Sequence, residues 1–474
     1  MRRRAPATAL ALLTLAGCAV GPSYRRPESA VPAASYRGTP EDPASLADLP
    51  WFEVFRDEVL RGLVAESLAR NRDLLAAAER VEQARGLAAV QRGALFPQAD
   101  FDLEASRGRD ALLGRPAAGI GTQNLYFGAL NAAWELDVWG RIRRATEAAR
   151  AELLATEAFR RGVVLSLVTG VAQAYFELRG LDLELEITRR TVASFRETRD
   201  LFERQFRGGV TSKLDYLRGE AALAQAAAAM PELERLIVAK ENQLSVLLGR
   251  PAGAIERGAV LTAQSLPPEV PAGLPSQLLE RRPDVIQAEQ RLHAETARIG
   301  EAFAGFFPRI GLTAVAGRTS GELESALSGP SFWTLAGSAV GPIFTFGRTW
   351  YGWRAAEAGA RAALQDYEQS VLIALADVSD ALTARDKLAA VRIDQERAVE
   401  ALAESLRIAR IRYVGGLASY LEVLDAQQQL FPAELDLART RRDELIAVVA
   451  LYRALGGGWQ DAPAPPSIPL PFAP

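Results

Sequence analysis

The chain has 474 residues, of which 49% are hydrophobic and 24% are charged, and its formal net charge is −3. This length is ample for a large core, and the near balance of charge argues against a nucleic-acid-binding surface, which needs a clustered basic face. One His, one Cys and two Met residues leave little for histidine catalysis, disulfides or soft-metal ligation, so we expect no enzyme, no cofactor and no metal site.

The N-terminus has the order of a secretory signal. Three consecutive arginines at 2–4 precede an apolar stretch over 7–16, which is too short to span a membrane. The small residues before Cys18 match the bacterial lipoprotein signal, in which the Cys becomes the lipidated first residue. We therefore predict a signal peptide over 1–17 and lipidation of Cys18; the alternative is an ordinary signal peptide with an incidental Cys. Ala19, where an Asp would retain a lipoprotein in the inner membrane, favours the outer membrane.

The first part of the mature chain is expected to be extended and then helical. Residues 18–50 are rich in Pro, Ser and Ala and should run over a surface. Residues 51–95 are predicted to be helical, in more than one piece, with Asn71 capping one of them. Phe96-Pro97 then breaks the helix.

The period of the apolar residues changes in 96–139. Apolar side chains take every second position in Phe101–Ala105 and Tyr126–Val138, with polar side chains between them. Period two with one apolar and one polar face predicts strands. The pattern returns over 307–346, where Phe332–Phe346 holds the last strand. Each strand has the ten or so residues of a tilted transmembrane strand, so we predict two transmembrane β-hairpins.

Two long helical stretches follow the two strand hairpins. No Pro interrupts Gly140–Arg207, and its apolar residues step by three, four or seven, as in a coiled coil. If helical, the stretch would extend roughly 100 Å. It then turns at a Gly-Gly pair and returns. We predict helical hairpins over 140–250 and 347–457, with a linker and helical segment over 251–306 and a Pro-rich tail over 458–474.

The second half of the chain repeats the first. The positions listed here recur at one constant offset (347 − 140 = 207): Gly140, Gly209 and Gly249 return as Gly347, Gly416 and Gly456. Upstream of Pro97 the offset is slightly longer, so one duplication carries a single change of length. A period this long exceeds that of a solenoid unit and indicates two copies of one structural half.

The predicted strands are the only segments suited to cross a membrane, because no stretch of about 18 apolar residues follows the signal. Four strands per chain leave an open edge, which lipid forbids, so a barrel must be shared among copies. Two chains would give eight strands, whose lumen fills with side chains. Three would give twelve, which can enclose a water-filled pore.

The mature chain from Cys18 to about Trp459 resembles the outer-membrane efflux channel family of TolC-like, NodT-type lipoproteins, which serve RND-type tripartite efflux systems. Five motifs carry the resemblance: Cys18–Pro27, Trp51–Asp57, Asn71–Leu74, Trp134–Arg141 and Tyr413–Ala426.

This resemblance implies a mainly α-helical fold with a β-barrel part. Long helical hairpins would form a periplasmic tunnel, and four transmembrane strands per chain would join in a trimeric 12-strand barrel. The implied function is the outer-membrane channel of a tripartite efflux system that exports small molecules. The implied partners are two further copies, outer-membrane lipid, a periplasmic adaptor (membrane fusion protein) and an inner-membrane pump, without nucleic acid.

In the family, the turns between the long and return helices lie at the periplasmic end, where the adaptor docks. Here the resemblance places these docking tips at Gly208, Gly209 and Val210 and at Gly415, Gly416 and Leu417. Gly supplies the backbone freedom that such a turn needs. The alternative is that these residues only stop a helix.

The resemblance also implies a periplasmic gate. Glu422 and Asp425 are three residues apart, so they share a helix face, and they align with the family's ring of carboxylates. Leu421 aligns with its apolar constriction. The alternative for this acidic face is simple solvation.

A latch between neighbouring helical hairpins is implied as well. Asp215 and Tyr413 align with the family's Tyr-to-acid latch. In the family a second latch often uses an Arg at the position where this chain has Ala418, so the sequence does not decide whether the second latch exists. Arg412 is a possible substitute for that Arg.

Three other functions remain as alternatives. Within the duct interpretation, the runner-up to small-molecule efflux is protein secretion. A periplasmic coiled-coil adaptor or scaffold lipoprotein is disfavoured because it needs no lipid-facing strands. An envelope enzyme is disfavoured because no catalytic set is present: the single His293 is expected to be a surface or packing residue.

Overall fold

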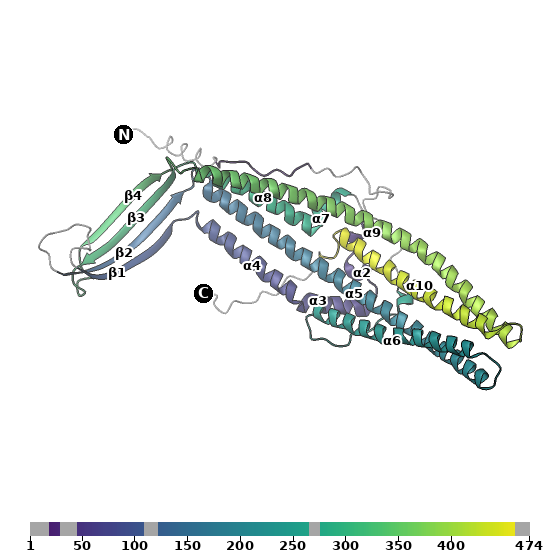
Figure 1. Ribbon diagram of the computed structural model, residues 1–474. Coiled ribbons are helices and arrows are strands. Elements are labelled where there is room, and N and C mark those ends of the chain that lie inside the picture. Colours follow the sequence, from purple (N-terminus) through teal and green to yellow (C-terminus); the bar gives the residue numbers. More distant parts are fainter. Residues whose placement is uncertain (1–18, 29–44, 109–121, 265–274, 460–474) are drawn as a thin grey trace. The chain divides into compact units, whose positions relative to one another are not determined.

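The structure is a computed structural model, and it describes residues 19–28, 45–108, 122–264 and 275–459 (Figure 1). The predicted signal peptide, Cys18, most of the N-terminal segment and the Pro-rich tail lie outside the described residues. The elements in chain order are η2 (Leu46–Asp48), α2 (Trp51–Val54), α3 (Glu58–Arg70), α4 (Arg72–Gly93), β1 (Gln98–Gly108), β2 (Gln123–Leu136), α5 (Arg141–Arg207), α6 (Lys213–Leu247), η3 (Leu261–Ala263), η4 (Pro275–Gln277), α7 (Leu278–Arg281), α8 (Pro283–Ala304), β3 (Arg309–Ser320), β4 (Ser331–Val340), α9 (Arg348–Val414) and α10 (Tyr420–Ala454).

These elements belong to two compact units. Unit 1 contains the described residues of 1–28, 80–157 and 287–368, and unit 2 contains those of 29–79, 158–286 and 369–474. Unit 1 holds the four strands and the helical segments next to them in the chain. Unit 2 holds most of the two helical hairpins, hairpin 1 (α5 and α6) and hairpin 2 (α9 and α10). The prediction of a mainly helical chain with a smaller β part is confirmed.

In unit 1 the four strands form one antiparallel sheet in the order β1-β2-β3-β4 (Figure 1). Backbone pairing aligns Phe101 with Leu130, Leu130 with Ala316 and Ala316 with Trp333, so this row across the sheet is apolar. Phe101, Leu130 and Trp333 are nevertheless exposed. The sheet therefore presents an apolar face that no residue of the described chain covers fully.

The opposite face of the sheet is polar near β1. Asp100 pairs with Asn131, whose Nδ2 donates a hydrogen bond to Asp100 Oδ1 at 3.0 Å, and Asp102 and Glu104 lie on the same side. The alternation predicted from the sequence is thus confirmed by the strand register. β1 and β4 each pair with a single strand of the described sheet.

The last strand ends earlier than predicted. The sequence pattern extended it to Phe346, but β4 stops at Val340. Gly341 and Pro342 follow, and Pro has no N–H to donate to a ladder. The end of β2 also differs, because Asp137 caps α5: its carboxylate accepts hydrogen bonds from the backbone N–H of Ile142 at 2.9 Å and of Arg143 at 2.8 Å.

The two helical hairpins have equal dimensions. α5 and α9 each contain 67 residues, and α6 and α10 each contain 35. The glycines that recur in the sequence have positive φ angles in both copies, as at Gly249 (70°) and Gly456 (77°). The duplication inferred from the sequence is therefore present in the fold. Among the described residues, no helix is both long and apolar enough to cross a membrane.

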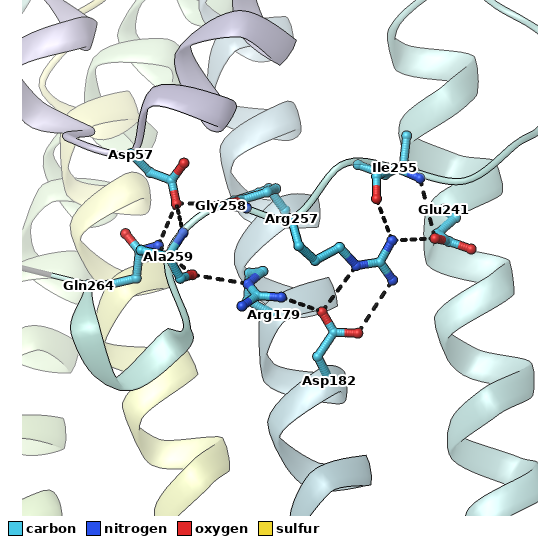
Figure 2. A network of polar contacts seen from close by, with 10 residues as sticks. Asp57, Arg179, Asp182, Glu241, Ile255, Arg257, Gly258, Ala259 and Gln264 are labelled. Carbon is cyan, nitrogen blue, oxygen red and sulfur yellow. Dashed lines mark hydrogen bonds and ion pairs between the residues drawn. The ribbon is translucent and has the colours of Figure 1, made fainter.

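In unit 2 a buried carboxylate joins three segments of the chain (Figure 2). Asp57 caps α3 through Oδ1, which accepts from the backbone N–H of Leu60 at 3.1 Å. Its Oδ2 accepts from Tyr175 Oη at 3.0 Å, from the Ala259 N–H at 3.1 Å and from Gln264 Nε2 at 2.6 Å. Asp57 thereby fixes the linker after hairpin 1 against α5 and the start of α3.

Arg257 continues this network toward α6 (Figure 2). Its guanidinium donates to both carboxylate oxygens of Asp182, at 3.2 and 3.3 Å, and to Glu241. Arg179 also donates to Asp182, at 2.6 Å, and to the Ala259 carbonyl at 3.1 Å. One linker arginine thus ties α5 to α6 in the middle of hairpin 1.

Gly249→Ala is expected to lower the free energy of unfolding by about 1–2 kcal/mol or more, because an L-residue is strained at positive φ. A Cβ there would also lie 2.3 Å from the Arg70 carbonyl oxygen. Thermal unfolding in detergent measures the effect. Gly86→Ala is the control: it lies in α4 with no atom within 4 Å of the added Cβ, and should stabilise by about 0.5–1 kcal/mol. Equal effects of the two substitutions would contradict the turn geometry.

Asp57→Asn is expected to lower the free energy of unfolding by about 1–3 kcal/mol, because an amide nitrogen would face donors where Oδ2 now accepts. Burial alone would raise the pKa of Asp57, but hydrogen bonds from Gln264, Leu60 and Tyr175 outweigh it and lower the pKa below 3.8. This stabilisation is therefore complete above about pH 4 and is lost as the pH falls through the lower native pKa.

The denaturation midpoint of wild type, measured from neutral pH downward, should fall in that acidic range by more than the midpoint of Asp57→Asn. The exposed Asp394→Asn should follow the wild-type curve. An identical acid response in Asp57→Asn and wild type would show that this carboxylate does not stabilise the fold.

Candidate functional site

The two hairpin tips have the same backbone geometry. At the end of α5, the Gly209 N–H donates to the Phe206 carbonyl and the Val210 N–H to the Gln205 carbonyl, at 3.0 and 2.8 Å. At the end of α9, Gly416 and Leu417 repeat both bonds at 3.0 and 2.9 Å. This pair of bonds is a Schellman motif, whose reversing residue takes positive φ. Gly209 and Gly416 have φ of 73° and 68°.

The tips expose apolar side chains that the turns themselves do not need. Val210 and Leu417, which follow the reversing glycines, are 79% and 76% exposed. A Cβ added at Gly209 or Gly416 would meet no atom within 4 Å, so the backbone is open on its outer side. The tips therefore combine hydrogen-bonded turns with exposed apolar side chains.

The three predicted gate residues share one exposed face at the start of α10. Leu421, Glu422 and Asp425 are exposed, whereas Val423 and Leu424 between them are buried. The exposed residues border a groove of about 570 Å³ between the hairpins. On the α6 side the groove is lined by Arg218, Ala221, Ala222 and Gln225. The groove thus joins acidic residues of hairpin 2 to an arginine of hairpin 1.

The carboxylates at the two tips have different partners. Asp215 accepts hydrogen bonds from Ser212 Oγ at 2.7 Å and Thr211 Oγ1 at 3.1 Å, which lower its pKa, and Arg218 Nη1 lies 3.7 Å away. Ser212 is the N-cap of α6, so the Asp215 carboxylate takes part in the hydrogen bonds that cap this helix. In hairpin 2, Ala418 replaces the threonine, and Glu422 faces Arg412 Nε at 3.8 Å instead.

The predicted pairing of Asp215 with Tyr413 does not form within one chain. Tyr413 Oη accepts a hydrogen bond from Gln205 Nε2 at 2.7 Å, and this bond links α9 to α5. Asp215 is engaged by hydroxyl groups of its own helix cap, which are closer in sequence and form at lower entropic cost. Within the described chain, the hydrogen bond that links the two hairpins at Tyr413 therefore comes from Gln205.

Apolar packing holds hairpin 2 against hairpin 1 just behind the tips. Leu424 of α10 lies in a cluster with Val192, Phe195 and Phe202 of α5. Thr198, between them, donates to Gln427 Oε1 at 3.2 Å and lies 3.0 Å from Tyr420 Oη. The buried face of α10 therefore fixes the position of the opposite face, which carries Leu421, Glu422 and Asp425.

Two site residues were not singled out from the sequence. Gln205 and Arg218 are ordinary polar residues in helical stretches, and no motif marks them. The internal repeat does mark them, because their counterparts 207 residues later are Arg412 and Asp425. Both counterparts were singled out through the family resemblance.

In unit 1 the N-terminal segment is fixed beside the sheet. The Val20 N–H donates to the Trp139 carbonyl at 3.0 Å, and Arg144 donates to the Val20 and Gly21 carbonyls at 3.2 and 3.1 Å. Arg26 forms two hydrogen bonds, at 2.8 and 2.7 Å, with the Glu289 carboxylate. The residues that follow Cys18 are thus held where β2 passes into α5.

His293 is a packing residue of the same region. Its ring stacks on Tyr24 with centroids 4.5 Å apart, and its Nε2 lies 3.1 Å from Glu147 Oε1. It is half-buried between the N-terminal segment and α5, which agrees with the expectation from the sequence.

Comparison with known proteins identifies relatives over almost the whole chain. The family model described as "Outer membrane efflux protein" matches residues 63–250 and 274–457. The solvent efflux pump outer membrane protein SrpC of Pseudomonas putida is 36% identical over 459 residues, which cover 95% of this chain and 97% of SrpC. Each segment matched by the family model holds one strand hairpin and one helical hairpin.

Two solved structures are similar in fold and sequence. The outer-membrane channel OprN superposes with a TM-score of 0.86 at 33% identity, covering 94% of this chain and 100% of OprN. The open state of the Neisseria gonorrhoeae MtrE outer membrane channel has a TM-score of 0.84 at 31% identity, covering 93% of this chain and 99% of MtrE.

A double-mutant cycle distinguishes the observed hairpin link from the predicted one. Gln205→Leu and Tyr413→Phe should show a coupling of about 0.5–1.5 kcal/mol in unfolding experiments, because each removes the same hydrogen bond. Asp215→Ala with Tyr413→Phe should be additive within about 0.5 kcal/mol. Additivity in the first cycle together with coupling in the second would show that Tyr413 pairs with Asp215 rather than with Gln205.

Proposed function

Since the chain belongs to the outer membrane efflux protein family, we propose that three copies form one gated export channel, with a shared barrel in the outer membrane and its entrance at the hairpin tips. The chain itself is an outer-membrane efflux component.

The sheet supports a shared barrel of twelve strands. Its apolar face suits lipid, and the face that carries Asp100, Asp102 and Glu104 suits water. Both sheet edges are unpaired within the described chain, which lipid does not allow. Eight strands from two copies would leave a lumen filled with side chains, whereas twelve from three copies can enclose a water-filled path. We therefore favour the homotrimer.

The exposed face of α10 supports a gate. Around a threefold axis, Leu421, Glu422 and Asp425 of three copies would surround the entrance, with an apolar ring beside two levels of carboxylates. The link from Gln205 to Tyr413 and the ion pair from Arg412 to Glu422 would hold the tips in the closed state. The ion pair is exposed and the hydrogen bond is only part-buried, so a docking partner can release these few contacts.

The tips support docking of a periplasmic adaptor, with an inner-membrane pump behind it. Val210 and Leu417 offer apolar contacts beside Gly209 and Gly416, whose missing side chains allow close approach by another helical hairpin. The pump would select the exported small molecules and supply the energy, while this protein provides the path.

The N-terminal segment supports a lipid anchor at Cys18. Hydrogen bonds from Arg144 hold residues 20 and 21 at the end of β2, so acyl chains on Cys18 would start close to the membrane surface. Lipid chains insert by apolar burial and need supporting contacts to hold firmly, which the strands would supply.

The observation that carries the gate is the exposure of two carboxylates beside the groove between the hairpins, and single-channel recording in planar bilayers tests it. Glu422→Ala with Asp425→Ala should lower the cation-to-anion permeability ratio by about fivefold or more, since one charge at 4 Å is worth about 1 kcal/mol in water. Asp394→Ala with Asp436→Ala removes two exposed carboxylates elsewhere on hairpin 2 and should leave the ratio unchanged. An unchanged ratio in the first variant would place the gate elsewhere.

Cys18→Ser tests the anchor. Without the thiol, lipidation cannot occur, so the variant should take up no labelled palmitate and should accumulate unprocessed or outside the outer membrane. Palmitate labelling equal to wild type would show that Cys18 is not the attachment site.

A further inference from the structure

A second groove, of about 510 Å³, lies along the middle of α5 and α9, away from the hairpin tips. We call it the mid-helix groove. Its polar lining comes from α5, α9, α10 and the junction of α7 with α8, and includes Gln173, Asp377, Asp380, Arg453 and Arg282. All of its lining residues belong to unit 2. A groove of this volume can hold a small organic molecule.

The apolar part of the mid-helix groove consists of small residues. They come from the same three long helices and are Gly170, Ala381, Ala384, Val449 and Ala450. Short side chains keep the groove open and offer apolar contact area to a molecule that lies in it.

Two of the charged groups in the groove are already paired. Arg282 is buried and donates to both carboxylate oxygens of Asp284, at 3.0 and 2.6 Å. It also donates to Asp377 Oδ2 at 2.9 Å and to the Ala454 carbonyl at 3.2 Å. Arg282 and Asp377 therefore form part of the wall, and their charges are largely neutralised by each other and by Asp284.

The other two charged groups are available to a ligand. Asp380 of α9 and Arg453 of α10 are both exposed and line the same groove. Among the described residues, neither side chain forms a hydrogen bond or an ion pair, and they do not pair with each other. One carboxylate and one guanidinium, carried by different helices, thus border a small apolar surface.

The mid-helix groove opens on the side of the helices that the remaining segments of unit 2 leave uncovered. The covered side is marked by Tyr175, which donates to Asp57 Oδ2 at 3.0 Å, and by Tyr452, which donates to the Leu49 carbonyl at 2.9 Å. Gln173 precedes Tyr175 by two residues, a rotation of about 200° around α5. The groove residues therefore lie opposite the layer formed by the segments around Leu49 and Asp57.

In the proposed channel, the uncovered side faces the path of the exported molecules. The layer around Leu49 and Asp57 would fill the tunnel if it lay inside, so it belongs on the outer surface of the helices. A solute that moves from the hairpin tips toward the barrel then passes the mid-helix groove.

Resting on the channel proposed above, we propose that the mid-helix groove is a transient binding site for zwitterionic small molecules, which carry an ammonium and a carboxylate group on an apolar frame. Asp380 accepts hydrogen bonds from the ammonium group, Arg453 donates to the carboxylate, and the small residues contact the frame. A solute with a single charge gains only one of the two contacts. Exposed charge contacts are weak, so the solute also leaves readily, as conduction requires.

Three matched probes test the site in single-channel recordings of the full-length protein. The dipeptide leucyl-phenylalanine is a zwitterion, its C-terminal amide carries only the ammonium group, and its N-acetyl form carries only the carboxylate. Each should interrupt the current briefly while it occupies the groove. The dipeptide should stay about fivefold longer than either derivative, the effect of one charge contact at about 4 Å in water.

Two substitutions assign the contacts to their residues. Asp380→Asn should shorten the interruptions by the dipeptide and by its amide about fivefold and leave those by the N-acetyl form unchanged. Arg453→Gln should shorten those by the dipeptide and by the N-acetyl form instead. Both side chains are exposed, so the fold should be preserved. Asp386→Asn and Arg397→Gln alter exposed charges of α9 outside the groove and should change nothing.

Interruptions of equal length by the three probes, or interruptions that neither groove substitution shortens, would overturn the site. The proposed channel would stand in both cases, because the wild type conducts. A wild type that forms no conducting pore would contradict the channel itself.

Binding can also be measured without conduction, by saturation-transfer NMR of the dipeptide with the full-length protein in detergent. The signal should be lost in Asp380→Asn with Arg453→Gln and kept in Asp386→Asn with Arg397→Gln. A signal equal to wild type in the first double variant would overturn the site, whatever the conductance shows.

Discussion

In the part of the chain that the structure describes, the outer edges of β1 and β4 pair with no further strand, and the proposed assembly depends on how these edges are paired. The sheet has four strands in sequence order, so its two edges belong to the first and last strand and cannot pair with each other in so small a sheet. In water such edges invite aggregation, and in lipid they are forbidden. In the proposed channel these edges are closed by other copies, and the number of copies decides whether a path for solutes exists. The apolar row through Phe101, Leu130 and Trp333 makes lipid the medium that this sheet fits.

The internal duplication explains why the two helical hairpins of one chain have the same backbone structure but different side chains. Turns, lengths and the positive-φ glycines are shared. Most of the side chains differ, and the differences that bear on the proposed gate lie near the tips. Thr211 helps to occupy the carboxylate of Asp215 within the α6 cap, whereas Ala418 cannot do the same for Glu422. In hairpin 1 the carboxylate of Asp215 is therefore used within the α6 cap. In hairpin 2 the carboxylate of Glu422 borders the groove at which the gate is proposed.

The sequence predicted those features that depend on local pattern. The period-two stretches became strands with the expected faces, the Gly-Gly pairs became turns, and Asn71 caps α4 as expected by accepting from the Leu74 N–H at 3.0 Å. Local competition was harder to foresee. Alternation continued past Val340, but Pro342 cannot donate to a ladder, and the alignment that paired Asp215 with Tyr413 did not include the hydroxyls that bind Asp215 first.

Contacts between distant segments were not predictable from pattern at all. The network around Asp57 draws on Tyr175 of α5 and on Ala259 and Gln264 of the linker, which are ordinary residues in the sequence. Gln205 and Arg218 were likewise unmarked by any motif. For these two the repeat held the information, because a residue opposite a recognised one in the other half occupies the same place in its hairpin.

The proposed channel requires three copies of the open sheet to close one water-filled barrel, and the mass of the intact assembly tests this requirement. Native mass spectrometry of the full-length protein, released from outer membranes in a mild detergent, should show three chains, because three sheets of four strands close a barrel with a lumen. A stable monomer or dimer as the only species under these conditions would contradict the shared barrel and, with it, the proposed path for export.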